Sequence, residues 1–397
     1  MNHSRAENRL LMTVAQRELS DDQRTELRRL VKQEIDFDYV FTTAQTHGLL
    51  PLLQKHLATA AGDLLPGHFL SRLKLQSVAN SQNVLHLLNR QLKLCKLLEE
   101  NGVPIAILKG SLLSQMAYDD IALRAAGDID ALIRPQDFAR ARQLLESLGY
   151  EMSPKLTPPQ LDSHLKHHCE LQFMRDDWFT IVDLHWALAP KSFVFKLETG
   201  EVMSRLQSVE IAGAQIKTLA TEDLILYLSM HGAKHLWRGL EWISSLGELI
   251  RAAESIAWST IVERAEHAHA TRMLALGLRL ATTVSGIHVP AEVFNTLDRD
   301  DSAKRMAHNI LSQLFNISDF AESTETNLYN FKIMDRKRDA LVSALRAIFV
   351  PTLTDWHALE LPPSLHSLYY AYRPLRLSKA YSSALWRKLG SRGAACL

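Results

Sequence analysis

Residues 103–134 read VPIAILKGSLLSQMAYDDIALRAAGDIDALIR, and this stretch decides the fold. Its first six residues form an apolar run rich in β-branched side chains, which predicts a buried strand. Gly110 follows the strand, and Ser111 is predicted to be the N-cap of a helix over residues 112–118. The free backbone N–H groups at such a helix start form a seat for phosphate, and Lys109 adds a positive charge at the same corner.

The end of this stretch, residues 127–133, alternates polar and apolar side chains, as a half-buried strand does. Asp128 and Asp130 therefore lie on one face of the strand, and Ile129 lies on the other. Two carboxylates this close at a partly buried position repel each other, and each raises the other's pKa. A divalent cation removes that repulsion. Oxygen ligands without Cys or His between them suit Mg²⁺ or Mn²⁺ better than Zn²⁺.

The order of strand, Gly-Ser, helix and a strand with Asp-x-Asp resembles the nucleotidyltransferase fold of the DNA polymerase β superfamily. A narrower resemblance is to a bacterial group called uncharacterised nucleotidyltransferases. It is carried by Leu-Lys-Gly at 108–110, Tyr118, Arg124, Gly-Asp-Ile-Asp at 127–130 and Leu-Gly-Tyr at 148–150. The insert between the glycine and the first aspartate is longer than in the wider superfamily, and the narrower group shares it.

Two further strands are predicted over residues 169–174 and 179–188, joined as a hairpin by a turn at 175–177. In the second strand, Asp183 and His185 alternate with apolar residues and so face the same way. The resemblance implies that this strand supplies the superfamily's third carboxylate, which makes Asp183 the general base or a ligand of a second metal. The alternative for Asp183 is an ion pair with a nearby Arg or Lys. His185 either supports the metal site or phosphate, or it is a core histidine.

A helix that starts at Thr221, its predicted N-cap, ends with His231, Lys234 and His235 at positions i, i+3 and i+4. This spacing places up to three positive groups on one surface of the helix. They either cap the helix C-terminus or bind the nucleotide triphosphate, and the resemblance favours nucleotide binding.

Another histidine cluster lies on a short helix predicted over residues 161–168. His164, His167 and His168 share one face of that helix. An exposed polar face is the leading interpretation. A contact with substrate phosphate is the main alternative, and a metal cluster ranks below it because no Cys, Asp or Glu lies at zinc-ligand spacing.

The rest of the chain is mainly helical in pattern, apart from a hairpin over residues 207–218. Helices are predicted over residues 10–17, 22–32, 36–47, 50–59, 69–100, 135–148, 239–253, 258–269, 271–286, 300–318, 330–349 and 363–376. We therefore predict an α+β protein in which a small mixed β-sheet nucleotidyltransferase core is flanked by N-terminal and C-terminal helical regions. The predicted division is an N-terminal helical region over 1–100, the core over 101–219 and a C-terminal helical domain over 220–397.

Composition narrows the classes of function. The 397 residues carry 45 Lys plus Arg against 44 Asp plus Glu, so the strongly basic balance of a nucleic-acid-binding protein is missing. No apolar run is long enough for a membrane span, and the first residues do not resemble a secretory signal. Three scattered cysteines are too few for a disulfide framework or a zinc site, so a cytoplasmic location is expected. The basic residues between 373 and 392 are predicted to be a solvated end rather than an RNA site.

The predicted function is a two-metal nucleotidyltransferase that moves NMP from an NTP to a hydroxyl acceptor and releases pyrophosphate. The predicted catalytic and metal-binding residues are Asp128, Asp130 and Asp183. The predicted nucleotide-binding residues are Lys109, Gly110, Ser111, Arg124, His185, His231, Lys234 and His235.

Two alternatives belong to other classes of protein. An NTP-binding sensor or scaffold without turnover has little reason to keep three mutually repelling carboxylates, and a helical nucleic-acid adaptor needs a basic face. The sequence does not identify the acceptor or the oligomeric state. Neutral charge favours a small molecule or a peptide or protein hydroxyl over RNA.

Overall fold

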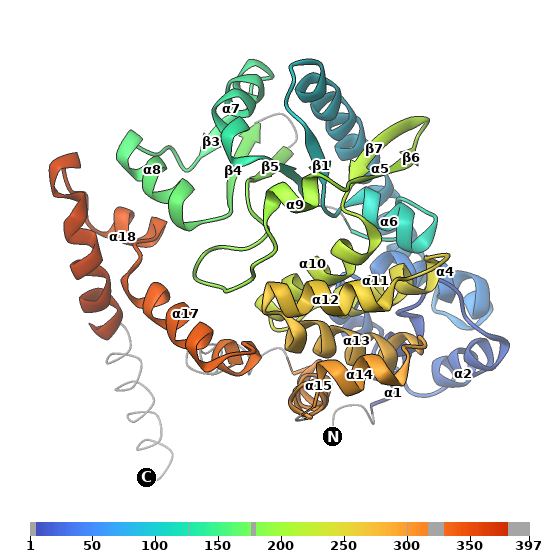
Figure 1. The fold of residues 1–397 in the computed structure, drawn as a ribbon. Helices are drawn as coiled ribbons and strands as arrows, with labels where there is room; N and C mark the ends of the chain where they lie inside the picture. The colour runs from blue at the N-terminus through green and yellow to red at the C-terminus, as the bar shows by residue number, and fades with distance from the viewer. Residues whose placement is uncertain (1–4, 126, 176–179, 300, 317–328, 380–397) are drawn as a thin grey trace, which may run out of the picture.

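The computed structural model describes residues 5–125, 127–175, 180–299, 301–316 and 329–379 (Figure 1). Its strands form a five-stranded sheet and a separate two-stranded hairpin, surrounded by helices. The predicted α+β class is therefore confirmed. Among the described residues, no helix combines the length and the apolar character needed to cross a bilayer.

The sheet has the strand order β1-β2-β5-β4-β3. Its strands are β1 (Ile105–Ile107), β2 (Ile129–Ile133), β3 (Glu151–Ser153), β4 (Glu170–Arg175) and β5 (Thr180–His185). β2 and β5 are parallel, whereas the other described pairs are antiparallel, so the sheet is mixed as predicted. The parallel register places Asp130 opposite Asp183. Residues 176–179 of the predicted hairpin turn lie outside the described residues.

The two faces of the sheet belong to two different hydrophobic cores. Ile129, Ala131 and Val182 pack into a core with apolar side chains of the long helix α5 (Gly67–Glu100) and of α7 (Phe138–Ser147). Ala106 of β1 and Leu132 of β2 point to the opposite face and belong to the core of the helical body. Because neighbouring strand residues point to opposite faces, Asp130 lies on the face that looks toward the helical body. Figure 1 shows α7 above the sheet and the helical body below it.

The helical body is built from both ends of the chain. Its N-terminal helices are α1 (Ala6–Val14), α2 (Asp21–Val31), α3 (Phe37–Thr46) and α4 (Leu50–Ala60). Its later helices are α10 (Thr221–Lys234), α11 (Leu240–Ala252), α12 (Trp258–Ala268), α13 (Thr271–Ser285), α14 (Ala291–Leu297) and α15 (Ser302–Gln313). Buried residues of both groups form one continuous core. We retain the predicted division at residues 100 and 220 as a proposal.

Several shorter elements complete the fold. They are α6 (Ser111–Tyr118), α8 (Pro158–His167), α9 (Thr199–Met203), α17 (Lys337–Phe349), α18 (Leu353–Ala358), the hairpin strands β6 (Gln207–Ile211) and β7 (Ala214–Thr218), and the 3₁₀ turns 62–64, 135–137 and 363–368. The helix predicted over 330–349 is interrupted, because residues 334–336 are not helical. The expected solvated end is also wrong in part. Arg373 and Arg376 each contact buried Asp355 at 2.6 Å, whereas residues 380–392 lie outside the described residues.

Two predicted helix caps are wrong. Ser111 is the first residue of α6, and the N-cap is Gly110. Gly110 has φ of 70° and ψ of −139°, a backbone conformation that glycine adopts without the clash of a side chain. Thr221 is likewise the first residue of α10, after Ala220, and its hydroxyl contacts Gln207 instead of the helix backbone.

The end of α10 is held by a close contact between Gly232 and the fully buried ring of Trp237. A Cβ at Gly232 would lie 2.6 Å from three atoms of that ring. We expect Gly232→Ala to lower the free energy of unfolding by about 1–3 kcal/mol, because overpacking a filled core forces side chains out of their preferred conformations. The measurement is urea unfolding of the full chain. Gly200→Ala in α9, where no atom lies within 4 Å of a Cβ, is the matched control. Equal unfolding midpoints for both variants would contradict the prediction and show that the Trp237 ring can shift to accommodate a methyl group at little cost in stability.

Candidate active site

The turn after β1 brings the backbone N–H groups at the start of α6 close to a buried ion pair. Gly110 turns the chain into α6, so that the first backbone N–H groups of that helix face the same corner. Just before it, Lys109 Nζ lies 3.0 Å from Asp130 Oδ1. Ser111 is buried, and its hydroxyl lies 3.5 Å from Gln91 Oε1 on α5. Binding of phosphate by Gly110 and Ser111 stays a prediction.

Three carboxylates meet next to this corner. Asp128, Asp130 and Asp183 each offer an oxygen atom, and these atoms all lie within 4.8 Å of one another. Asp183 thus joins the first two aspartates, as a third carboxylate of the same site must, and this proximity follows from the parallel pairing of β2 with β5. No ion pair of Asp183 with Arg or Lys is present in the part of the chain that the structure describes, which argues against the alternative role of this residue.

The cluster fits a hard divalent cation. Asp130 Oδ2 and Asp183 Oδ1 are buried and have no hydrogen-bond partner among the described residues. A buried carboxylate oxygen without a partner is costly, and a cation supplies the missing interaction. All three donors are carboxylate oxygens, which Mg²⁺ and Mn²⁺ prefer.

Asp128, which immediately precedes β2, and Asp130 within β2 differ in their electrostatics. Burial and the charge of Asp130 raise the pKa of Asp128 to about 6, as the predicted repulsion requires. Asp130 does not follow that prediction. Burial alone would raise the pKa of Asp130, but Lys109 and His185 outweigh that effect and hold it below its ordinary value. The repulsion therefore falls mainly on Asp128, because Asp130 has two positive partners.

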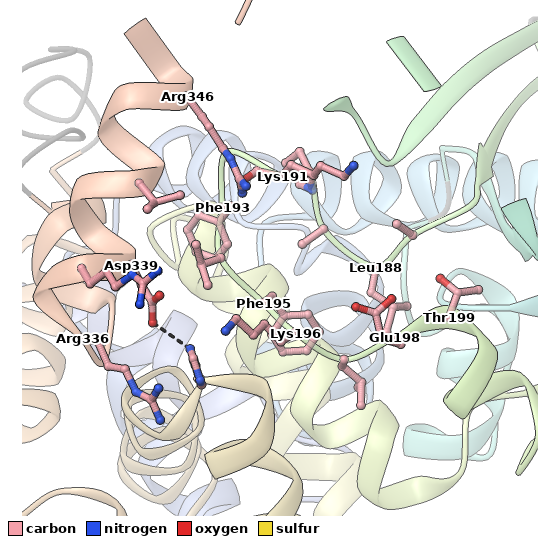
Figure 2. Close-up of a pocket in the computed structure, with 18 residues that line it drawn as sticks. Leu188, Lys191, Phe193, Phe195, Lys196, Glu198, Thr199, Arg336, Asp339 and Arg346 are labelled. Atoms are coloured by element: carbon pink, nitrogen blue, oxygen red, sulfur yellow. Dashed lines mark hydrogen bonds and ion pairs between the residues drawn. The ribbon is translucent and has the colours of Figure 1, made fainter. Parts of the chain in front are cut away.

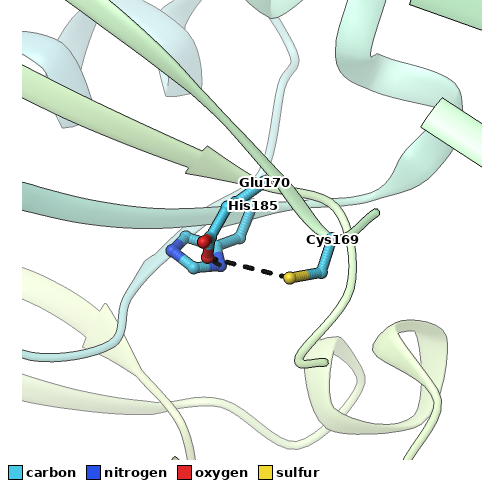
Figure 3. Close-up of side chains that lie close together, drawn as sticks. All are labelled: Cys169, Glu170 and His185. Atoms are coloured by element: carbon cyan, nitrogen blue, oxygen red, sulfur yellow. Dashed lines mark hydrogen bonds and ion pairs between the residues drawn. The ribbon is translucent and has the colours of Figure 1, made fainter. Parts of the chain in front are cut away.

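His185 lies between Asp130 and a fourth carboxylate. Its Nε2 atom is 3.2 Å from Asp130 Oδ1, and its Nδ1 atom is 3.2 Å from Glu170 Oε2. Figure 3 shows His185 beside Glu170. His185 is buried, as a core histidine would be, but it contacts the carboxylate cluster directly. Sequence reasoning missed Glu170. The register of the predicted hairpin was the available signal, since it pairs Glu170 with His185.

The end of α10 carries fewer charges than predicted. The rings of His231, His235 and Trp242 form a cluster in which the His231 and His235 centroids are 4.7 Å apart. Burial lowers the pKa of His231 well below its ordinary value, and burial together with Lys234 lowers that of His235 to about 4. Both imidazoles are therefore neutral at neutral pH. Nucleotide binding by these residues stays a prediction.

Arg124 is a buried link between the inserted loop and the helical body. Its guanidinium group forms an ion pair with Glu241 on α11 and donates a hydrogen bond to the carbonyl oxygen of Gly110 at 3.3 Å. Arg124 thus fixes the turn that follows β1. Its predicted contact with nucleotide stays a prediction.

The predicted exposed face on α8 is wrong for His164, which is buried. Its ring stacks on His168 with centroids 4.2 Å apart, and its Nε2 atom contacts the carbonyl oxygen of Glu170. His167 instead contacts the hydroxyl of Tyr370. The three histidines therefore do not form one surface.

A cavity of about 490 Å³ (Figure 2) has none of the three aspartates in its lining. It is lined by the loop 187–199, which follows β5, and by side chains of α17. Its walls carry Lys191, Lys196 and Arg336 together with the acidic Glu198 and Asp339. None of the predicted site residues lines it.

The sequence and structure of the chain were compared with known proteins. A search of curated proteins found no match. The solved structures that match include the solution structure of the antibiotic-resistance factor ANT(2'')-Ia. It shares 15% sequence identity, with a TM-score of 0.28 over 60% of this chain and 96% of that chain. The profile of a family described as "Uncharacterised nucleotidyltransferase" matches residues 33–286, which is more than half of the chain. The chain that brings these carboxylates together thus belongs to the family of uncharacterised nucleotidyltransferases.

Proposed function

We propose that the protein moves NMP from an NTP to a hydroxyl acceptor and releases pyrophosphate, with Asp128, Asp130 and Asp183 as its catalytic and metal-binding residues. The observation that carries this proposal is the meeting of three carboxylates beside the turn at Gly110. Membership of a nucleotidyltransferase family supports nucleotidyl transfer in general.

The three aspartates would hold Mg²⁺ or Mn²⁺ in a two-metal arrangement. When bound, such ions stabilise the charge that develops on the transferred phosphoryl group and lower the pKa of an attacking hydroxyl. The two buried oxygens without hydrogen-bond partners, Asp130 Oδ2 and Asp183 Oδ1, are the donors best suited to this role.

The chain itself supplies binding and proton transfer. The backbone N–H groups that follow Gly110 would bind the phosphates of the NTP, and Lys109 keeps Asp130 ionised. Asp183 would accept the proton of the acceptor hydroxyl. In the metal-free protein, burial and the charge of Asp130 raise the pKa of Asp183.

A sensor or scaffold that binds NTP without turnover is the alternative. The cluster argues against it, because a protein without turnover has little reason to keep three mutually repelling carboxylates. The acceptor is proposed to be a small molecule or a peptide or protein hydroxyl rather than RNA, since the chain has a formal charge of only +1.

The direct test is incubation of the full chain with each labelled NTP and Mg²⁺ or Mn²⁺. We expect pyrophosphate release together with label on the protein itself or on a component of a cell extract. Absence of both with every NTP, in a protein that still binds nucleotide, would favour the sensor.

Asp183→Ala is expected to lower turnover by about 10²-fold or more, which is the usual scale for loss of a positioned base. Nucleotide binding should persist, because the proposed phosphate seat at Gly110 is unchanged. Steady-state turnover and equilibrium NTP binding measure the two effects separately. Near-wild-type turnover in this variant would remove Asp183 from the mechanism.

Asp128→Asn is expected to abolish transfer and to keep or increase stability in metal-free buffer. A carboxyl group whose pKa rises from 3.8 to about 6 on folding binds its proton more tightly in the folded state. Its contribution to stability is therefore present at low pH and is lost as pH rises through that interval. Asn carries no ionisable group, so the Asp128→Asn variant does not lose this stability when the pH rises to neutral.

Asp130→Asn is the matched comparison and should melt below wild type, because Lys109 and His185 lose their buried partner. Thermal melts at neutral pH with a chelator and with Mg²⁺ distinguish the two variants. If Asp128→Asn also melts well below wild type without metal, Asp128 belongs to a structural ion pair.

A further inference from the structure

We propose that Cys169, Glu170 and His185 form a second metal site, separate from the three aspartates, which takes a zinc-like transition-metal ion. Cys169 immediately precedes β4, Glu170 is the first residue of β4, and His185 is the last residue of β5. The antiparallel register pairs Glu170 with His185, so the hairpin itself brings the three side chains together. Figure 3 shows them converging at the end of the sheet.

The spacing of the donor atoms suits one tetrahedral ion. Cys169 Sγ lies 3.7 Å from Glu170 Oε2, and Oε2 lies 3.2 Å from His185 Nδ1. All three donor atoms lie within 4.8 Å of one another. Zinc holds sulfur at about 2.3 Å and nitrogen or oxygen at about 2.0–2.2 Å, which places neighbouring ligands about 3–4 Å apart in a tetrahedron. The backbone is fixed here too, because the Cys169 carbonyl oxygen accepts a hydrogen bond from the Trp186 N–H at 2.9 Å.

His185 provides the observation that points to a cation. The residue is 3% exposed, and its Nδ1 atom faces Glu170 Oε2 at 3.2 Å without the geometry of a hydrogen bond. The other ring nitrogen, Nε2, contacts Asp130. An imidazole that donates from one nitrogen to a carboxylate and binds metal through the other is a common arrangement in metal sites, because the carboxylate fixes the tautomer and the ring orientation. The Glu170 carboxylate faces the ring nitrogen of buried His185, so a positive charge is needed between them, which is either a metal ion or a proton on Nδ1.

The chemistry of the donors distinguishes this ion from that of the aspartates. A thiolate and an imidazole favour Zn²⁺ or a similar transition metal, whereas the neighbouring all-oxygen set favours Mg²⁺ or Mn²⁺. Three protein ligands leave a fourth position for water. Solvent can reach that position beside Glu170, whose side chain is 39% exposed. Metal binding would release the thiol proton of Cys169.

A metal ion at this second site would also affect the aspartate cluster through His185. A metal ion on Nδ1 requires the remaining ring proton to sit on Nε2, which then donates to Asp130 Oδ1. That contact holds the Asp130 carboxylate in place and leaves its Oδ2 atom for the aspartate cluster. His185 is thus a positioning residue for Asp130, and the second metal would fix its tautomer.

Titration of the metal-free full chain with Co²⁺ tests the proposal, since Co²⁺ replaces Zn²⁺ and gives a thiolate-to-metal charge-transfer absorption. The Cys95→Ser/Cys396→Ser variant, which keeps Cys169 as its sole cysteine, should show this band with one Co²⁺ per chain. Adding Cys169→Ser should remove the band. Asp128→Asn, which alters the aspartate cluster, should retain it.

A second measurement covers variants that fold poorly. Zn²⁺ should raise the melting temperature of the Cys95→Ser/Cys396→Ser protein, and Glu170→Gln should reduce that rise. A protein that keeps its fold but shows neither the band nor the rise with excess metal would overturn the proposal and assign a proton to His185 Nδ1. A band that persists after Cys169→Ser would overturn it as well.

Discussion

The burial of the Asp130 carboxylate is the constraint on which the site depends. This residue is 3% exposed and lies beside two other carboxylates, so its charge needs compensation inside the protein. The compensation comes from Lys109 at the end of β1 and from His185 at the end of β5, the two strands that flank β2. Sheet order and charge balance are therefore linked, because each neighbouring strand supplies one positive group.

The same sheet also packs apolar side chains on both of its faces. Successive residues of β2 point to alternate faces, so the strand can place Asp130 in the polar site and still supply apolar side chains to both cores. Ile129 and Ala131 enter one core, while Leu132 enters the other, beyond Asp130. The helical body closes over the polar end of that face through specific contacts. Arg124 links the Gly110 carbonyl to Glu241 on α11, and the hydroxyl of Tyr118 meets Ser244 at 2.9 Å. The turn after β1 is thus held from the side of the helices as well as from the sheet.

Local patterns in the sequence predicted those features that depend on neighbouring residues. The alternation around Asp128 and Asp130 fixed their common face, and most helices follow from apolar periodicity. The proximity of Asp183 required the resemblance to a known fold, because a parallel pairing leaves no local signal. Contacts across the chain were not predictable in this way. Examples are the ion pair of Arg124 with Glu241 and the neutral state of His235, which follows from burial.

The contacts of Lys109 indicate a more specific role than phosphate binding, because its ammonium group pairs with one oxygen of Asp130. Its ammonium group is 3.0 Å from Asp130 Oδ1, the same oxygen that faces His185 Nε2, whereas Oδ2 has no hydrogen-bond partner among the described residues. Two positive groups on one oxygen leave the other oxygen as the donor for a metal ion. Burial would lower the pKa of Lys109, but the charges of Asp130 and Asp128 outweigh it and raise that pKa, so the lysine stays protonated. If a metal ion bound to Oδ2 drew charge from the carboxylate, the attraction of Oδ1 for Lys109 would weaken, and the ammonium group would become available to the phosphates at Gly110. Charge balance would thus connect the proposed metal site to the proposed phosphate-binding turn through one buried side chain.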